Sequence, residues 1–207
     1  MAVAAFAPAK VNLYLHLVGR RPDGYHLVDS LVAFADVGDR ITARSSASLT
    51  LKIDGPEATS LAGLGENNLM LRAARLLADH AGIAARAALH LEKNLPVAAG
   101  IGGGSSDAAA ALRALCALWQ VSVGDEDLRR LGVSLGADVP ACLHAGVAWV
   151  GSIGERVEPA LPLPPVGIVL ANPRIALPTA AVFAARRGSF GDPGRFVSMP
   201  PACDASQ

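Results

Sequence analysis

The residues best suited to chemistry lie in a short glycine- and serine-rich stretch near the middle of the chain. Gly100 to Ser106 contains four glycines and two serines, and it joins a predicted strand to an alanine-rich predicted helix. The first backbone N–H groups of a helix have no partner within it, and the helix dipole adds partial positive charge there. Glycine lets the backbone turn tightly and approach an anion closely. The stretch therefore predicts a phosphate-binding loop, with serine hydroxyls as additional donors.

Two common nucleotide-binding patterns do not fit this loop. A P-loop requires a lysine after its last glycine, and Gly104 is followed by Ser105 instead. A dinucleotide fingerprint requires glycine or alanine at the position that Ser105 occupies. The structural alternative is a flexible turn in which Ser105 only caps the next helix. Because the loop joins a strand to a helix, we favour the phosphate site.

Two other segments place charged residues where they could act in catalysis. In AKVNLYLHL (9–17), alternation puts Lys10 and Asn12 on one face of a predicted strand, opposite a half-buried apolar face. In GADVP (136–140), Asp138 could accept the proton of a hydroxyl group during phosphoryl transfer. The alternatives are an edge lysine whose stem covers apolar surface and an aspartate that caps the following helix. The residue pattern alone favours the cap for Asp138.

The elements that would position these residues are predicted from hydrophobic periodicity. Strands are expected at 9–17, in one or two segments of 25–44, and at 49–54, 87–96 and 166–173, with a hairpin-like segment at 142–157. Helices are expected at 66–82, from Ser105 or Ser106 to Trp119, at 126–136 and at 179–187. Prolines at 159, 162, 164 and 165 predict a boundary between two lobes. We therefore expect an α+β fold with domains at 1–157 and 158–207.

Composition restricts the class of protein. Lys plus Arg and Asp plus Glu number 18 each, so the net charge provides no overall field to hold nucleic acid or an anionic membrane. No apolar run reaches the roughly 18 residues of a membrane span, and the N-terminus does not resemble a secretion signal. Cys116, Cys142 and Cys203 form no CxxC pair, which argues against a metal site or a disulfide framework. We expect a cytoplasmic protein that binds a small molecule.

Three motifs, in this order, resemble those of a known family. PVAAGIGGGSSDAAAAL (96–112) is similar to the phosphate-binding motif of the GHMP small-molecule kinases, and GADVP fits the same family. APAKVNLYLHLVGRRPDGYH (7–26) most resembles the branch that phosphorylates 4-diphosphocytidyl-2-C-methyl-D-erythritol in the non-mevalonate isoprenoid pathway. The resemblance implies a two-lobe GHMP-kinase fold. Its N-terminal lobe would be like domain 2 of ribosomal protein S5, and its second lobe would be ferredoxin-like.

The resemblance also implies a reaction. ATP would transfer its γ-phosphoryl group to the 2-hydroxyl of the cytidine diphosphate-linked methylerythritol, with Asp138 as the base. Lys10 would keep this carboxylate ionised and orient the hydroxyl, because a nearby ammonium favours the charged form. Mg²⁺ would neutralise charge on the β- and γ-phosphate oxygens, through ligands that remain unassigned. The protein would be a monomer or a homodimer.

Residues near the N-terminus are implied to bind the substrate. Tyr25 would stack on the cytosine ring, and the backbone of His26 would pair with its edge. Phe183 matches a phenylalanine of the family on the other face of that ring. Asn12 would hydrogen-bond the same region of the substrate as Lys10. The alternative for Tyr25 and His26 is ordinary hairpin packing.

A second set of residues is implied to bind ATP. Asn68 would contact adenine through its side-chain amide, or else Asn67 or Asn68 would only cap the helix. Lys93 matches a lysine near the nucleotide in relatives. The remaining ATP-binding residues would be Pro96, Val97, Ala98, Ala99, Gly100, Ile101, Gly102, Gly103, Gly104, Ser105 and Ser106. Ala98 and Ala99 replace glycines that many relatives have.

The sequence departs from the family pattern after residue 187. A second glycine-rich motif is absent there, so we expect an incomplete second lobe, explained by a fragment, a frameshift or a true loss. One alternative function is another GHMP kinase, acting on mevalonate, homoserine or a sugar, which would need no cytosine clamp. Another is an inactive nucleotide-binding remnant. Exposed apolar surface where the second lobe would dock would favour the remnant.

Overall fold

A long β-hairpin forms the base of the fold in the computed structural model, which describes residues 1–61, 63, 65–173, 175, 177 and 179–192. Strands β1 (Ala2–Arg20) and β2 (His26–Arg44) pair antiparallel along nearly their whole length. On its other edge, β2 pairs with β4 (Ala88–Glu92) near its C-terminal end and with β5 (Ala148–Ser152) near its N-terminal end. The hairpin therefore joins both halves of the sheet.

Two short strands complete the six-stranded mixed sheet. β3 (Thr50–Asp54) runs parallel to β4, and β6 (Arg156–Pro159) runs antiparallel to β5. The order is β3-β4-β2-β5-β6, with β1 paired to β2. Segment 25–44, expected as one or two strands, forms one strand from His26, and the hairpin-like segment 142–157 includes β5 and the start of β6. β6 extends past residue 157, so the sheet of the first lobe continues beyond the boundary that we expected.

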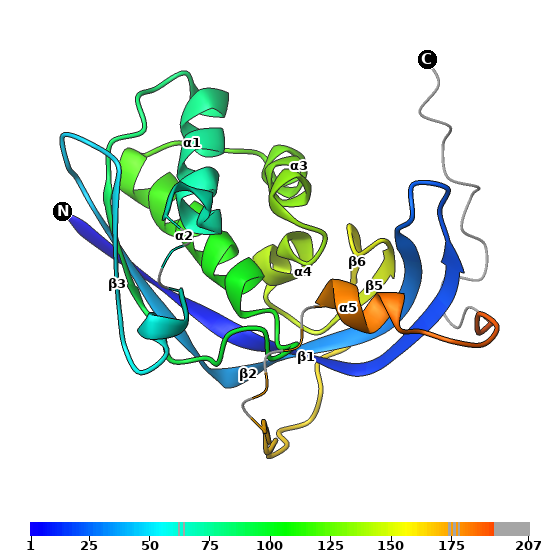
Figure 1. Cartoon of the computed structure of the whole chain (residues 1–207). Coiled ribbons are helices and arrows are strands. Elements are labelled where there is room, and N and C mark those ends of the chain that lie inside the picture. Colours follow the sequence, from blue (N-terminus) through cyan, green and yellow to red (C-terminus); the bar gives the residue numbers. More distant parts are fainter. Residues whose placement is uncertain (62, 64, 174, 176, 178, 193–207) are drawn as a thin grey trace.

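Helices cover one side of the sheet (Figure 1). The helices are α1 (Leu69–Ala81), α2 (Gly103–Trp119), α3 (Asp125–Leu135) and α4 (Val139–His144), with 3-10 turns at Ala58–Leu61 and Gly65–Asn67. As predicted, α1 ends where Gly82 adopts the left-handed conformation and its N–H bonds the last turn. Our predicted helices did not include α4, although the capping alternative for Asp138 implied a helix at this place. Pro140 stands in its first turn, where a missing N–H costs nothing.

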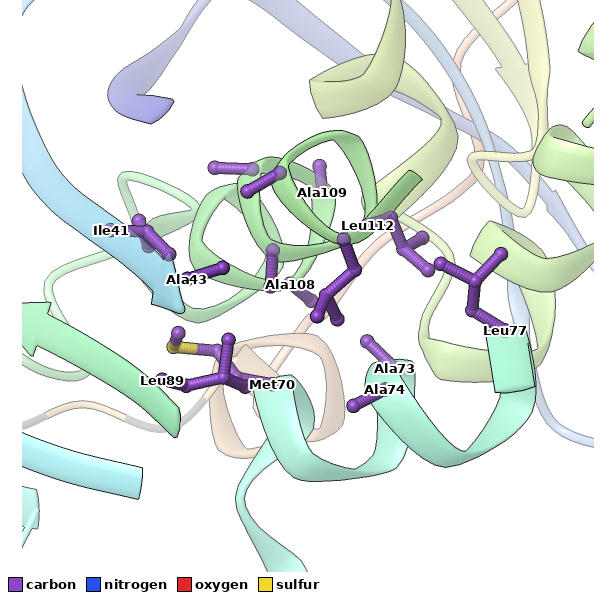
Figure 2. Close-up of a cluster of buried hydrophobic side chains, with 14 of the residues drawn as sticks. Ile41, Ala43, Met70, Ala73, Ala74, Leu77, Leu89, Ala108, Ala109 and Leu112 are labelled. Carbon is purple, nitrogen blue, oxygen red and sulfur yellow. The ribbon is translucent and has the colours of Figure 1, made fainter. Parts of the chain in front are cut away.

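The main core lies between the sheet and helices α1 and α2 (Figure 2). Ala108 to Ala111 are all inaccessible to solvent, and Leu112 and Leu115 follow on the same buried helix. Small alanine side chains let α2 lie close to both Ile41 of β2 and Leu77 of α1, so the helix is enclosed on several sides. This burial fixes α2, and with it the glycine loop that precedes it.

Strand β1 differs from its predicted pattern. Leu13 and Leu15 on the apolar face are 43% and 48% exposed, whereas Lys10 on the polar face is 6% exposed. The pairing with β2 slips between Pro8 and Lys10 and again between Asn12 and Tyr14. Such bulges re-aim side chains. The face that carries Lys10 therefore turns toward the interior, opposite to the simple expectation.

The segment after β6 also differs from the prediction. Residues 166–173 were expected to form a buried strand, but they form neither strand nor helix and are exposed, Val169 to 94%. Leu161 and Val166 are exposed as well. A short helix, α5 (Thr179–Ala184), follows within the predicted 179–187. Exposed apolar side chains that form one patch would be typical of a surface that another part of a protein covers. The expected ferredoxin-like second lobe stays a prediction.

Candidate active site at the glycine loop

The glycine loop connects β4 to α2 and passes directly beside Lys10. The Lys10 backbone N–H donates to the Ile101 carbonyl over 2.9 Å, so β1 is bonded to the loop where its pairing with β2 slips. Gly102 has a φ of +68°, and a Cβ there would lie 3.1 Å from Cβ of Lys10. Both the conformation and the close approach therefore require glycine. Ala98, with a φ of +54°, adopts a conformation that glycine prefers.

Helix α2 begins at Gly103, two or three residues before the predicted start. Gly102 is the N-cap and provides no side-chain hydrogen bond, so the alternative in which Ser105 caps the helix is wrong. Gly103, Gly104 and Ser105 are instead in the first turn, where backbone N–H groups have no intrahelical acceptor. The hydroxyl oxygen of Ser106 is buried and has no partner among the described residues. These donors together form an anion-binding arrangement.

Lys10 and Asp138 meet beside this loop although 128 positions separate them in the sequence. The Lys10 Nζ atom lies 2.8 Å from Asp138 Oδ1, with Lys10 buried and Asp138 45% exposed. Asp138 is the N-cap residue of α4 but its side chain makes no cap hydrogen bond, so the capping alternative is wrong. The carboxylate is bound to the lysine and remains accessible to a ligand.

The backbone around Asp138 is held from two directions. A Cβ on Gly154, in the turn between β5 and β6, would lie 2.8 Å from the Ala137 carbonyl oxygen, so this turn packs directly against the loop. The Arg113 side chain, from α2, donates to the Cys142 carbonyl of α4 over 2.9 Å. Both contacts place Asp138 relative to the glycine loop.

The Cys142 thiol near this site is not a nucleophile. Burial raises its pKa to about 12, so it stays protonated.

Lys93 lies beneath the loop in a buried charge cluster that we did not anticipate. Its Nζ atom is 2.6 Å from Asp39 Oδ2 and 2.7 Å from Asp107 Oδ2, and the lysine is only 2% exposed. Asp39 also accepts from the backbone N–H groups of Asn94 and Leu95, where the chain enters the loop. The cluster thus ties β2 to both ends of the glycine loop. The Lys93 side chain is engaged in this cluster, and its expected place near the nucleotide stays a prediction.

Asp107 makes stability depend on pH. Burial raises its pKa to about 7, although Lys93 opposes the rise, and Asp39 adds to it. The native state then binds more protons than the unfolded state between the unfolded pKa, about 4, and about 7. We predict that the free energy of unfolding falls as pH rises through this window, and that Asp107→Asn removes this fall. Urea unfolding of both proteins across the window measures it, and equal slopes would contradict the prediction.

Asn68 caps helix α1. Its Oδ1 atom accepts from the Met70 N–H over 2.9 Å, and the side chain is buried. The capping alternative is therefore confirmed for this residue. A contact with adenine would have to come from its remaining atom, Nδ2, and stays a prediction.

The aromatic residues implied to hold cytosine lie toward the turn of the β1–β2 hairpin. The His26 and Phe183 rings stack with centroids 5.1 Å apart and an interplanar angle of 18°. Tyr25 precedes His26 and is 57% exposed, with its backbone held by Asp23 and Arg21. The structure therefore brings together His26 and Phe183, which are far apart in the sequence. A ring that stacks on this face of Phe183 would have to displace the imidazole of His26.

The described residues include no cluster of three or more His, Cys, Asp or Glu side chains that could hold a metal ion. None of the helices in this part of the chain is long and apolar enough to cross a membrane. Two surface cavities, of about 360 and 530 Å³, lie on the sheet near Phe6 and beside the end of α2, away from this site. Cys203 is outside the described residues.

Comparison with known proteins defines the class to which this site belongs. Residues 68–146 match the family model for the GHMP kinases N terminal domain, which spans the glycine loop and Asp138. A crystal structure of 4-(cytidine 5′-diphospho)-2C-methyl-D-erythritol kinase is similar, with a TM-score of 0.72 and 40% identity, over 92% of this chain and 67% of that chain.

Curated relatives specify the family further. The 4-diphosphocytidyl-2-C-methyl-D-erythritol kinase of Paramagnetospirillum magneticum is 52% identical over 94% of this chain and 67% of its own length. The enzyme of the same name from Ruegeria pomeroyi is 55% identical over 88% of this chain and 63% of its own length. The chain belongs to the 4-diphosphocytidyl-2-C-methyl-D-erythritol kinase family, and it spans about two thirds of the length of the relatives it matches.

Proposed function

We propose that this chain transfers the γ-phosphoryl group of ATP to the 2-hydroxyl of 4-diphosphocytidyl-2-C-methyl-D-erythritol, a step of the non-mevalonate isoprenoid pathway. The observation that carries the proposal is the Lys10–Asp138 pair, 2.8 Å apart, beside a glycine loop that opens a helix. Family membership at about half identity supports the choice of substrate.

The reaction needs a proton acceptor and stabilisation of phosphate charge. In the proposed step, the substrate oxygen bonds to the γ-phosphorus, the bond from that phosphorus to the ADP oxygen breaks, and Asp138 accepts the hydroxyl proton. Lys10 holds the carboxylate and balances its charge. The N–H groups of Gly103, Gly104 and Ser105 donate hydrogen bonds to phosphate oxygens. The buried Ser106 hydroxyl has no hydrogen-bond partner among the described residues. Because buried hydroxyls are nearly always hydrogen-bonded, this supports phosphate binding at the start of α2.

Mg²⁺ is part of the proposal. It supplies charge neutralisation on the β- and γ-phosphate oxygens when bound. Kinase sites usually hold this ion through substrate phosphates and one or two side chains rather than a protein cage. We leave the side-chain ligands unassigned.

The cytosine end of the substrate would bind at Tyr25, His26 and Phe183. The His26–Phe183 stack supports this, because one face of Phe183 already packs against a flat ring. Base–aromatic stacking contributes about 1–3 kcal/mol per base. Kinases of mevalonate, homoserine or sugars would not need these aromatic side chains, because their alcohol substrates carry no cytosine ring.

The test is ADP release from ATP and Mg²⁺, with and without 4-diphosphocytidyl-2-C-methyl-D-erythritol. We expect ADP release that depends on this substrate and is absent with mevalonate, homoserine or galactose. Release with one of those alcohols instead would contradict the substrate. A folded chain that binds ATP but releases no ADP with any of them would contradict the activity and favour the inactive remnant.

Asn68 allows its two roles to be separated. Asn68→Ala is expected to lower the free energy of unfolding by about 1 kcal/mol through loss of the cap, and to raise the KM for ATP. Asn68→Asp keeps a capping oxygen but has no amide donor, so it should retain stability while still raising the KM for ATP. Urea unfolding and ADP-release kinetics measure both. An unchanged KM for ATP in Asn68→Asp would show that Asn68 acts only as the cap of helix α1.

A further inference from the structure

Ser30 is a fully buried polar residue near the N-terminal end of β2, close to the proposed catalytic face. Its neighbours on the same side of the strand, Val28 and Val32, belong to a small apolar cluster. The Ser30 hydroxyl has two partners. Its oxygen accepts from Asn12 Nδ2 over 2.7 Å, and its hydrogen is donated to the Tyr14 carbonyl over 2.5 Å. Both partners come from β1.

These two contacts determine which way the Asn12 amide faces. A serine hydroxyl has a single hydrogen, and here the backbone carbonyl of Tyr14 takes it. Ser30 can therefore only accept from Asn12. With the amide turned over, Oδ1 of Asn12 would face the Ser30 oxygen with no hydrogen between two acceptors. The network thus assigns Nδ2 to Ser30 and leaves Oδ1 of Asn12 for other partners.

Asn12 stands on the same face of β1 as Lys10. The pairing with β2 is regular from Lys10 to Asn12, so their side chains project to the same side, with Cα atoms about 6–7 Å apart. The Asn12 side chain is partly exposed, unlike Ser30. An amide oxygen offered there attracts a hydroxyl group and repels phosphate oxygens. The opposite orientation would offer N–H donors, which also attract phosphate oxygens.

We infer that Ser30 is a positioning residue, which orients Asn12 so that its Oδ1 accepts a hydrogen bond from a hydroxyl of the polyol part of the acceptor substrate. The inference rests on the proposed function for the identity of that substrate. Ser30 touches no reacting atom and acts only through Asn12. Recognition at Asn12 is then selective for a hydroxyl donor over an anion.

A double-mutant cycle tests whether Ser30 acts through Asn12. We expect Ser30→Ala to lower kcat/KM for the acceptor alcohol roughly three- to tenfold, the size of one hydrogen bond, with little change in the KM for ATP. In an Asn12→Ala background, the same substitution should cause no further loss. Ser30→Thr, which keeps the hydroxyl, should restore most of the activity. Ser134→Ala, which removes a hydroxyl on α3, serves as the control. Equal losses in both backgrounds would overturn the inference.

A second measurement needs no turnover. The side-chain amide signals of Asn12 can be assigned by their disappearance in Asn12→Ala, and their hydrogen exchange can be followed by NMR. We expect exchange in Ser30→Ala to be roughly three- to tenfold faster than in the unmodified chain, and unchanged in Ser134→Ala. Unchanged exchange in Ser30→Ala would overturn the inference even if the kinase is active. Faster exchange in an inactive chain would contradict only the proposed function.

Discussion

Asp138→Asn is expected to lower kcat for ADP release by about two to four orders of magnitude, the usual contribution of a general base. The asparagine side chain has nearly the same shape, but it is a far weaker proton acceptor. It also leaves Lys10 without the negative charge that now lies 2.8 Å from its Nζ atom. The KM for ATP should change little, because the phosphates are proposed to bind the first turn of α2.

Steady-state ADP release under saturating ATP measures this effect. The matched control is Asp127→Asn on α3, which also removes an ion-paired carboxylate, that of the Arg130 pair, but lies away from the glycine loop. The control should retain full activity. If Asp138→Asn were as active as Asp127→Asn, Asp138 would not be the base. A parallel rise in the KM for ATP would instead point to a disturbed glycine loop.

Lys93→Met is expected to lower the free energy of unfolding by about 3–5 kcal/mol, as for other buried ion pairs that lose one partner. The substitution leaves Asp39 and Asp107 buried without the cation that both now contact, at 2.6 and 2.7 Å. Methionine fills a similar volume, so lost packing contributes little. We expect activity at low temperature to fall too, because Asp39 holds the entry to the glycine loop.

Urea unfolding compares this variant with Lys52→Met. Lys52 also pairs with an aspartate, Asp54, over 3.1 Å, but the lysine is 74% exposed and its loss should cost no more than about 1 kcal/mol. Adding Asp39→Asn and Asp107→Asn to Lys93→Met should recover part of the stability, since no buried charge then remains. Equal destabilisation by Lys93→Met and Lys52→Met would show that the buried cluster contributes no more than a surface pair.

The local chemistry of this protein follows from the sequence by itself. Four glycines before an alanine-rich run predict an anion-binding helix start, because backbone freedom and free N–H groups are properties of a few consecutive residues. Alternation in 9–17 predicted that Lys10 and Asn12 share a face, and regular pairing with β2 confirms this. Asn68 and Gly82 marked the two ends of α1 for the same local reasons. Resemblance to a family then connected these separate motifs.

The tertiary structure decided which partner each polar residue has. The sequence pattern favoured a helix cap for Asp138, but folding brings Lys10 to it across 128 positions and leaves the cap unused. The family resemblance implied only that Lys93 lies near the nucleotide, and the fold adds that Asp39 of β2 and Asp107 of α2 enclose its side chain. Ser30 carries no motif, and its link to Asn12 depends on the register of the hairpin. Such partners come from segments far apart in the chain, and only packing determines which of them meet. Local pattern therefore predicts the kind of chemistry, whereas the fold selects the residues that perform it.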